Sequence, residues 1–477
     1  MGKRIAIVGA GLGGLSAALR LAHLGFEVEI FEKTDQVGGR NRAIRVGDCD
    51  FDAGPTLLMM LDPFRRLFQD VGERLEDHLD LHRCDPAYRV FYADGTRLEA
   101  HADEHRLQNE IARISPSDAA ALPRFRKELA ALYEAAIPNF VETNFLSPWD
   151  FFAPRKLGLV QRHKMLANLG RRVEKRFRDP RIQMLFSFQT LYLGLSPYEA
   201  PWVYSTLVHM ELAEGVWYPM GGVAKISETI AELAMKKGVQ IHLNEPVKAI
   251  EGKSLILESS GSREFDAIIC NADLPYAERE LLGQAEKVRQ DSCSALMIYA
   301  EYKGELPDLL HHNVFFSSDF RGNLDQIFNV AKIPEDPSFY ACISAKTDPN
   351  RAKPGTENLY ILIPCPNLER RWSDRDEEVL IERAFARLNS ETGFCPSKIR
   401  HMARFGPRDW KDRFNLDKGA AFGLSHHFSQ SAYFRPSNRS RANPNVYFVG
   451  ASTIPGNGMP MVVISAELTV DRILKSL

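Results

Sequence analysis

The N-terminus carries a glycine-rich turn between an apolar strand and a helix, and this turn constrains the fold more than any other feature. Residues 3–8 are expected to form a buried strand, followed by Gly9, Ala10, Gly11, Leu12, Gly13 and Gly14, a helix, and a second strand over residues 27–32. Gly9 suits a tight turn, Gly11 lets backbone amides approach a pyrophosphate, and Gly14 lets helix and strand pack closely. The anion would lie at the helix N-terminus, where free amides favour negative charge. The start of the chain therefore predicts a Rossmann-like unit that binds a dinucleotide.

An acidic residue ends the second strand of this unit. Glu32 lies 23 residues after Gly9, where a carboxylate can accept hydrogen bonds from ribose hydroxyls. Because a 2′-phosphate calls for a basic group at this place, Glu32 argues against NADP and leaves NAD and FAD open. The neighbouring Lys33 is included among the expected cofactor contacts.

Two further sequence motifs distinguish between FAD and NAD. Gly38, Gly39 and Arg40 place a guanidinium beside two small residues, which makes a second phosphate clamp because arginine offers paired donors. This element resembles that of the flavoproteins that include amine oxidases, GDP-dissociation inhibitors and carotenoid desaturases. The next motif resembles one in the bacterial and fungal phytoene and diapophytoene desaturases, where it runs past the flavin ring. In this chain it reads Phe51-Asp52-Ala53-Gly54-Pro55-Thr56. Gly54 and Pro55 give a rigid bend that can approach a flat ring, and Thr56 can hydrogen-bond a polar flavin edge.

The C-terminal segment carries the second block of motifs. A strand is expected to end at Gly450 and Ala451, and a helix to begin beyond Gly458, with Met459 and Val462 near its start. A helix start at this place can direct free amides at a flavin carbonyl or a ribityl phosphate. The block resembles the carotenoid-desaturase signature, except that Ile454 stands where a histidine is common. The same resemblance implies that Val247 holds the adenine through its backbone.

The resemblance implies an α/β fold with a discontinuous arrangement. A Rossmann-like FAD-binding domain of the glutathione-reductase and amine-oxidase type is expected over residues 1–75, 216–287 and 431–477, with a helix beginning within 217–223. A discontinuous α+β substrate domain is expected over residues 76–215 and 288–430. Strand-like runs after residue 288 favour a mostly antiparallel sheet covered by helices. The expected cofactor is non-covalently bound FAD.

Residues 133–178 combine aromatic and basic side chains. Between residues 155 and 178, nine basic residues face one acidic residue, Glu174, which gives a local charge of +8. Aromatic residues beside a basic helix suit the headgroup region of an anionic bilayer, so we expect membrane-associating helices here. A solvated helix face beside core aromatics is the alternative interpretation.

Composition limits the partners and the compartment. The 62 acidic and 60 basic side chains give a formal net charge of −2, so nucleic-acid binding is not expected. Seven scattered cysteines without a C-x-x-C pair fit a reducing cytoplasm. No run of 18 apolar residues occurs, so the expected location is cytoplasmic and peripheral to a membrane.

Three other candidate groups are interpreted as non-catalytic. The adjacent pairs His311-His312 and His426-His427 are not expected to bind a metal, because neighbours on regular elements point apart. Asp273 is interpreted as a helix N-cap before Leu274-Pro275 rather than as a catalytic acid.

The predicted chemistry is the dehydrogenation of a long C30 or C40 polyene such as phytoene or diapophytoene. A flavin can accept hydride from an allylic C–H, and the resulting cation is spread over double bonds, so a weak base suffices and no catalytic residue is assigned. Oxygen or a membrane quinone is the expected electron acceptor, because no second G-x-G-x-x-G serves a nicotinamide. The alternatives are a late-step carotenoid desaturase, oxygenase or isomerase, which Ile454 keeps open, an amine oxidase, and a prenyl-lipid carrier of the GDP-dissociation-inhibitor type.

Overall fold

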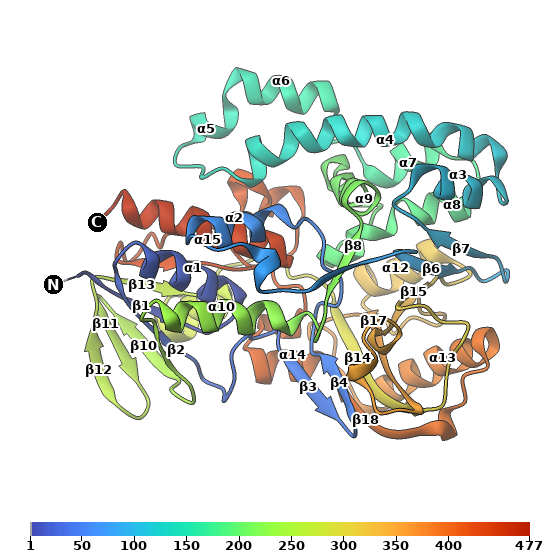
Figure 1. Ribbon diagram of the computed structural model, residues 1–477. Helices are drawn as coiled ribbons and strands as arrows, with labels where there is room; N and C mark the ends of the chain where they lie inside the picture. Colours follow the sequence, from blue (N-terminus) through green and yellow to red (C-terminus); the bar gives the residue numbers. More distant parts are fainter. Residues whose placement is uncertain (1) are drawn as a thin grey trace.

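Two large sheets and a layer of helices organise the computed structural model, which describes residues 2–477 (Figure 1). The first sheet is parallel and has the strand order β19-β13-β1-β2-β9. Its strands are β1 (Arg4–Val8), β2 (Glu27–Phe31), β9 (Gln240–His242), β13 (Ala267–Cys270) and β19 (Val446–Phe448). Segments from both ends of the chain and from its middle therefore meet in one sheet.

The side chains of β1 alternate between two hydrophobic cores, one on each face of this sheet. Ile5 and Ile7 belong to the large core that includes the helices α1 (Leu12–His23), α10 (Ala224–Lys236) and α15 (Met459–Leu474). Ala6 and Val8 belong to a separate core with β10 (Val247–Glu251) and β11 (Ser254–Leu257), which form an antiparallel sheet with β12 (Gly261–Glu264). Both faces are covered, which is why residues 5–8 of β1 are all apolar.

The second sheet is mostly antiparallel, as the sequence predicts. Its order is β18-β14-β17-β16-β15-β6-β7, and only the β15–β6 pair is parallel. The strands are β6 (Tyr88–Phe91), β7 (Arg97–Ala100), β14 (Ser294–Lys303), β15 (His312–Phe315), β16 (Phe339–Ile343), β17 (Thr356–Cys365) and β18 (Ile399–Phe405). The helix α13 (Asp374–Thr392) packs on one face through Leu380, Ala384 and Leu388.

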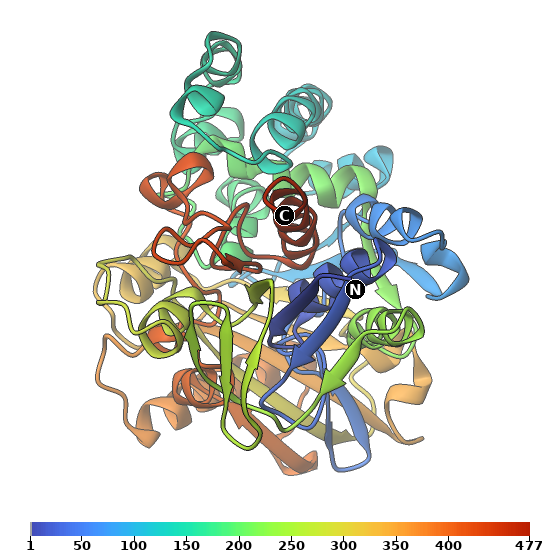
Figure 2. The same cartoon turned by 90° about the vertical axis from the view of Figure 1, so that its left-hand side faces the viewer.

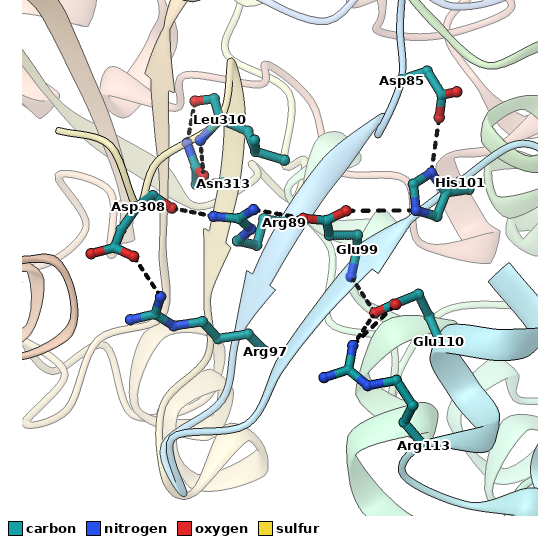
Figure 3. A network of polar contacts seen from close by, with 10 residues as sticks. All are labelled: Asp85, Arg89, Arg97, Glu99, His101, Glu110, Arg113, Asp308, Leu310 and Asn313. Atoms are coloured by element: carbon teal, nitrogen blue, oxygen red, sulfur yellow. Dashed lines mark hydrogen bonds and ion pairs between the residues drawn. The ribbon is translucent and has the colours of Figure 1, made fainter. Parts of the chain in front are cut away.

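Polar contacts fix the hairpin β6–β7 to the rest of this sheet (Figure 3). Arg89 donates to the carboxylate of Glu99 and to the backbone carbonyl of Asp308, each at 2.6 Å. Arg97 pairs with the Asp308 carboxylate at 2.8 Å, and the buried His101 lies 2.8 Å from Asp85. The two contacts with Asp308 join residues more than 200 positions apart and tie this hairpin to the loop between β14 and β15.

Helices from the middle of the chain form a layer over the sheets, at the top of Figures 1 and 2. They are α3 (Glu104–Ala112), α4 (Pro116–Ala136), α5 (Pro148–Phe152), α6 (Pro154–His163), α7 (Leu169–Arg176), α8 (Pro180–Leu185) and α9 (Thr206–His209). Other short elements include α2 (Asp62–Asp70), α11 (Leu274–Tyr276), α12 (Phe320–Phe328), α14 (Pro407–Phe414) and the pair β3 (Ala43–Val46) and β4 (Cys49–Asp52). Within residues 2–477, no helix is long and apolar enough to cross a bilayer.

One expected boundary is wrong. The helix expected to begin within residues 217–223 starts at Ala224, because the strand β8 (Val216–Pro219) precedes it. β8 pairs with β5 (Leu81–Cys84), and neither strand is predicted from the sequence. The pairing takes place between segments about 130 residues apart, so local sequence carries little information about it.

Candidate functional site

One cavity of about 610 Å³ gathers the predicted cofactor residues. All of them line it except Ala10 and Gly14; the lining members are Gly9, Gly11, Leu12, Gly13, Glu32, Lys33, Gly39, Arg40, Gly54, Pro55, Thr56, Val247, Gly450, Ala451, Gly458, Met459 and Val462. They come from residues 9–56, from Val247 and from residues 450–462. The motifs chosen from the sequence therefore describe one place in the folded protein.

The glycine turn has the geometry expected from its sequence. Gly9 has φ +97°, and a Cβ on Gly14 would collide with the carbonyl of Gly9. A Cβ on Gly11 would lie 2.7 Å from Nδ2 of Asn271. The first amide with an acceptor in this helix is that of Leu15, which donates to Gly11. The preceding amides of α1 are the free donors of a helix N-terminus at the cavity.

Glu32 holds the turn as well as facing the cavity. Its Oε2 accepts the Ala10 amide at 2.8 Å, and its Oε1 accepts the amide and hydroxyl of Thr34 at 3.0 and 2.8 Å. Ala10 therefore contributes by positioning this carboxylate rather than by lining the cavity. A carboxylate has about four acceptor sites, so Glu32 keeps capacity for ribose hydroxyls.

Three tyrosines clamp the segment that follows β4. The hydroxyl of Tyr299 donates to the Ala53 carbonyl at 2.6 Å, and that of Tyr360 donates to the Gly54 carbonyl at 2.7 Å. The Tyr340 hydroxyl lies 2.8 Å from Oγ1 of Thr56. The tyrosines stand on the neighbouring strands β14, β17 and β16. These contacts are not predicted from the sequence, because tyrosines within largely apolar strands, two in β14 and one each in β16 and β17, do not indicate which backbone groups they bind.

A buried arginine organises the C-terminal loops. The Arg435 guanidinium donates to the backbone carbonyls of Thr453, Ser425, Gln430, Leu424 and Ala451 at 2.6–3.4 Å. Burial lowers its pKa to about 10, so it stays charged at neutral pH. It joins residues 424–430 to the loop that precedes α15.

A histidine borders the cavity beside the position of Ile454. Ile454 is only 3% exposed and does not line the cavity, whereas His426 does. Nε2 of His426 accepts the amide of Asn457 at 3.3 Å, while His426 Nδ1 and Asn457 Oδ1 have no partner among the described residues. These two buried polar atoms, with the amides at the start of α15, suit the polar edge of a flavin ring.

Two expectations about other polar groups need correction. Asp273 occupies the N-cap position of α11, but its side chain makes no capping bond; it accepts the Ser452 hydroxyl and the Asp417 amide instead. The rings of His311 and His312 do not point apart: their centroids are 4.1 Å apart, and Cys84 completes a buried cluster. His311 precedes β15, so strand alternation does not apply to it.

The other end of the cavity is apolar. It is lined by Ile137, Phe140, Val141, Phe188, Leu191, Tyr192, Leu207, Met210 and Phe316. These residues come from the helical layer and from the end of β15. Their chemistry suits a hydrocarbon and offers few polar contacts.

Comparison with known proteins agrees with this arrangement. A zeta-carotene-forming phytoene desaturase of Myxococcus xanthus is 39% identical over 488 residues, covering 99% of this chain and 94% of that protein. A 4,4′-diapophytoene desaturase of Staphylococcus haemolyticus is 34% identical over 496 residues, covering 99% of each. Wild-type putrescine oxidase bound to putrescine has a TM-score of 0.63 at 16% identity, covering 100% of this chain and 99% of the other, which shows a shared fold.

The sequence family described as flavin containing amine oxidoreductase matches residues 12–474, nearly the whole chain. The glycine turn, the free amides and the unpartnered atoms at α15 fit its flavin cofactor, FAD. The chain therefore belongs to the flavin-containing amine oxidoreductases and has their fold of mixed α/β content.

Proposed function

We propose that this protein is an FAD-dependent desaturase of a long polyene hydrocarbon such as phytoene or diapophytoene. The proposal rests on one observation: the same cavity has a polar end lined by glycines and an apolar end. Two relatives of nearly full length bear the names of such desaturases. A long apolar substrate would lie in the apolar end, with an allylic C–H directed at the polar end.

The proposed FAD contacts follow the cavity. The amides of residues 11–14 and the Arg40 guanidinium would hold the pyrophosphate, and Glu32 the ribose. Val247 would hold the adenine, and residues 54–56, 450–451 and 458–462 the ring and ribityl chain. FAD supplies a hydride acceptor. The chain's own residues bind it, hold the polyene against it and exclude water from the developing cation.

The substrate is expected to come from a membrane. Phe140 and Val141 line the cavity, and the neighbouring Phe145, Phe151 and Phe152 pack against Tyr433 and Phe434. On α5 and just before it, Trp149 is 80% exposed and Leu146 56%. The basic Arg155, Arg162 and Lys164 are exposed nearby. An apolar surface continuous with the cavity and edged by cations suits peripheral attachment to an anionic bilayer.

Part of the basic run is engaged within the protein. Arg172 and Arg176 both pair with Glu128, and Arg172 lies over the ring of Trp202. The informative variant is therefore the combined Trp149→Ser, Arg155→Gln and Arg162→Gln protein, which should sediment less with anionic vesicles while keeping its flavin. Arg171→Gln with Lys175→Gln is the matched control on α7. Equal sedimentation of both variants and wild type would contradict the proposed surface.

The function is tested by expression in a host that accumulates colourless phytoene or diapophytoene. We expect coloured, more conjugated products without added NAD, and chromatography gives the substrate length and the number of steps. Oxygen and a quinone are then compared as electron acceptors for the purified protein. Turnover of an amine panel, with no polyene converted, would favour an amine oxidase instead.

A further inference from the structure

One carboxyl group is buried in the wall of the apolar end of the cavity. Glu211 is 2% exposed and lies in the short helical segment Met210–Glu214 after α9. Its Oε2 accepts the Tyr88 hydroxyl at 3.0 Å and the Gln189 amide at 2.9 Å, and its Oε1 accepts the Tyr192 hydroxyl at 2.8 Å. All its partners in the described chain are neutral. An unpaired acid among apolar residues is costly to bury, and it stands out in a wall of this kind.

Only one of these partners reaches the cavity. Tyr192 lines it together with Phe188, Leu191 and Met210, whereas Tyr88 and Gln189 lie behind. Tyr192 shares this cavity with Thr56 and Tyr340, which belong to the clamp on the expected flavin segment. The Tyr192 hydroxyl is therefore the route by which Glu211 can act on a substrate.

The pKa of the Glu211 carboxyl lies close to neutral pH. Burial raises the pKa of its carboxyl to about 7, although the three hydrogen bonds lower it. Burial also holds the pKa of Tyr192 well above its ordinary value, with Glu211 as the next cause. Near neutral pH the carboxyl can both accept and release a proton, while the tyrosine remains a neutral hydroxyl that can relay one.

We propose that Tyr192 and Glu211 form the proton-accepting pair of the dehydrogenation, an inference that rests on the proposed function. Bound FAD would accept a hydride, with its electron pair, from one allylic carbon. The C–H bond of the adjacent carbon then breaks, and its electrons form the new double bond. Its proton passes to the Tyr192 oxygen as the Tyr192 hydroxyl proton passes to Glu211 Oε1.

The test compares Tyr192→Phe, Glu211→Gln and Tyr88→Phe in the flavin-loaded protein supplied with polyene in vesicles. Wild-type turnover should rise with pH through about 7. Glu211→Gln should lose this rise and turn over about 100-fold more slowly, and Tyr192→Phe should show a similar loss of rate. Because the Tyr88 hydrogen bond lowers the pKa of Glu211, Tyr88→Phe should keep the rise but move it to higher pH.

Tyr133→Phe is the matched control. Its hydroxyl donates to Glu214 Oε1 at 3.2 Å, in the same helical segment, but neither residue lines the cavity. This variant should keep both the rate and the pH profile of the wild type. A loss equal to that of Tyr192→Phe would overturn the pair, because the effect would then be structural.

A readout independent of turnover is the infrared carbonyl band of a protonated carboxylic acid in the flavin-loaded protein. Burial also raises the pKa of Asp52, Asp273 and Asp291, so the signal of Glu211 is the component of this band that disappears as the pH rises through about 7 in the wild type and is missing in Glu211→Gln. If the wild-type protein converts no polyene, the proposed function is wrong, and so is the proposed role of Tyr192 and Glu211. A wild type that converts polyene, with Tyr192→Phe at full rate or no titrating band, overturns the pair alone.

Discussion

The two ends of the cavity are built by different means. At the polar end, glycines and helix starts place backbone amides at the cavity, and Arg435 holds the loop that precedes α15. At the apolar end, side chains from separate helices make the wall, and Glu211 is held by three side-chain hydrogen bonds. Backbone sites tolerate few changes at their glycines, whereas side-chain walls can be altered one residue at a time. The same fold can therefore keep its cofactor while its substrate changes.

The sharpest test of the backbone-built end is Gly11→Val. The added side chain meets Asn271 and occupies the place where a pyrophosphate would approach the turn. We expect flavin content to fall by at least about tenfold, roughly 1.4 kcal/mol or more of binding free energy. Absorbance of the purified protein measures it. Gly158→Val on α6 is the control, because a Cβ there meets nothing within 4 Å, and this variant should keep its flavin. Equal flavin content in the two variants would contradict the proposed place of the pyrophosphate at Gly11.

A second change removes the support behind the polar end. Arg435→Lys keeps the charge but cannot reach five carbonyls in the same fork geometry. Losing about two charge-assisted hydrogen bonds should lower the free energy of unfolding by about 3 kcal/mol. Chemical denaturation measures this, with the exposed Arg441→Lys as control. Similar midpoints for the two variants would show that the loops are held by other contacts.

At the apolar end, the buried Glu211 carboxyl should make the stability of the folded protein depend on pH. Because the folded-state pKa of Glu211 is raised to about 7, the folded protein binds a proton that the unfolded chain releases. Its contribution to stability is therefore present at low pH and is lost as the pH rises from about 4.5 through 7, by at most about 3 kcal/mol. Thermal unfolding of Glu211→Gln should vary less across this range than that of the wild type. Parallel curves would place the titration elsewhere.

Sequence alone predicts the polar end well and the apolar end poorly, for a physical reason. The conformations of Gly9 and Gly14 are imposed by neighbours in the chain, so the motif carries the geometry with it. The Tyr340–Thr56 contact joins residues 284 positions apart, and no local pattern encodes such a pairing. Glu211 did leave a trace, as one acidic residue in the apolar run 202–213. That trace becomes meaningful only when Tyr88 and Tyr192 are placed beside it.

The smallest expected effect tests where the two ends meet, at the tyrosine clamp. Tyr360→Phe removes the hydroxyl that donates to the Gly54 carbonyl, at a cost of about 1 kcal/mol in stability. Since residues 53–56 are the expected ring segment, FAD should also bind up to about tenfold more weakly, as fluorescence titration of the protein stripped of flavin would show. Tyr302→Phe on β14 loses a comparable hydrogen bond, from the Cys395 amide, away from the cavity. It should lower stability similarly while FAD affinity stays at the wild-type value. If both variants weaken FAD equally, the clamp acts through the sheet as a whole, and the polar end is not independent of the side chains beneath it.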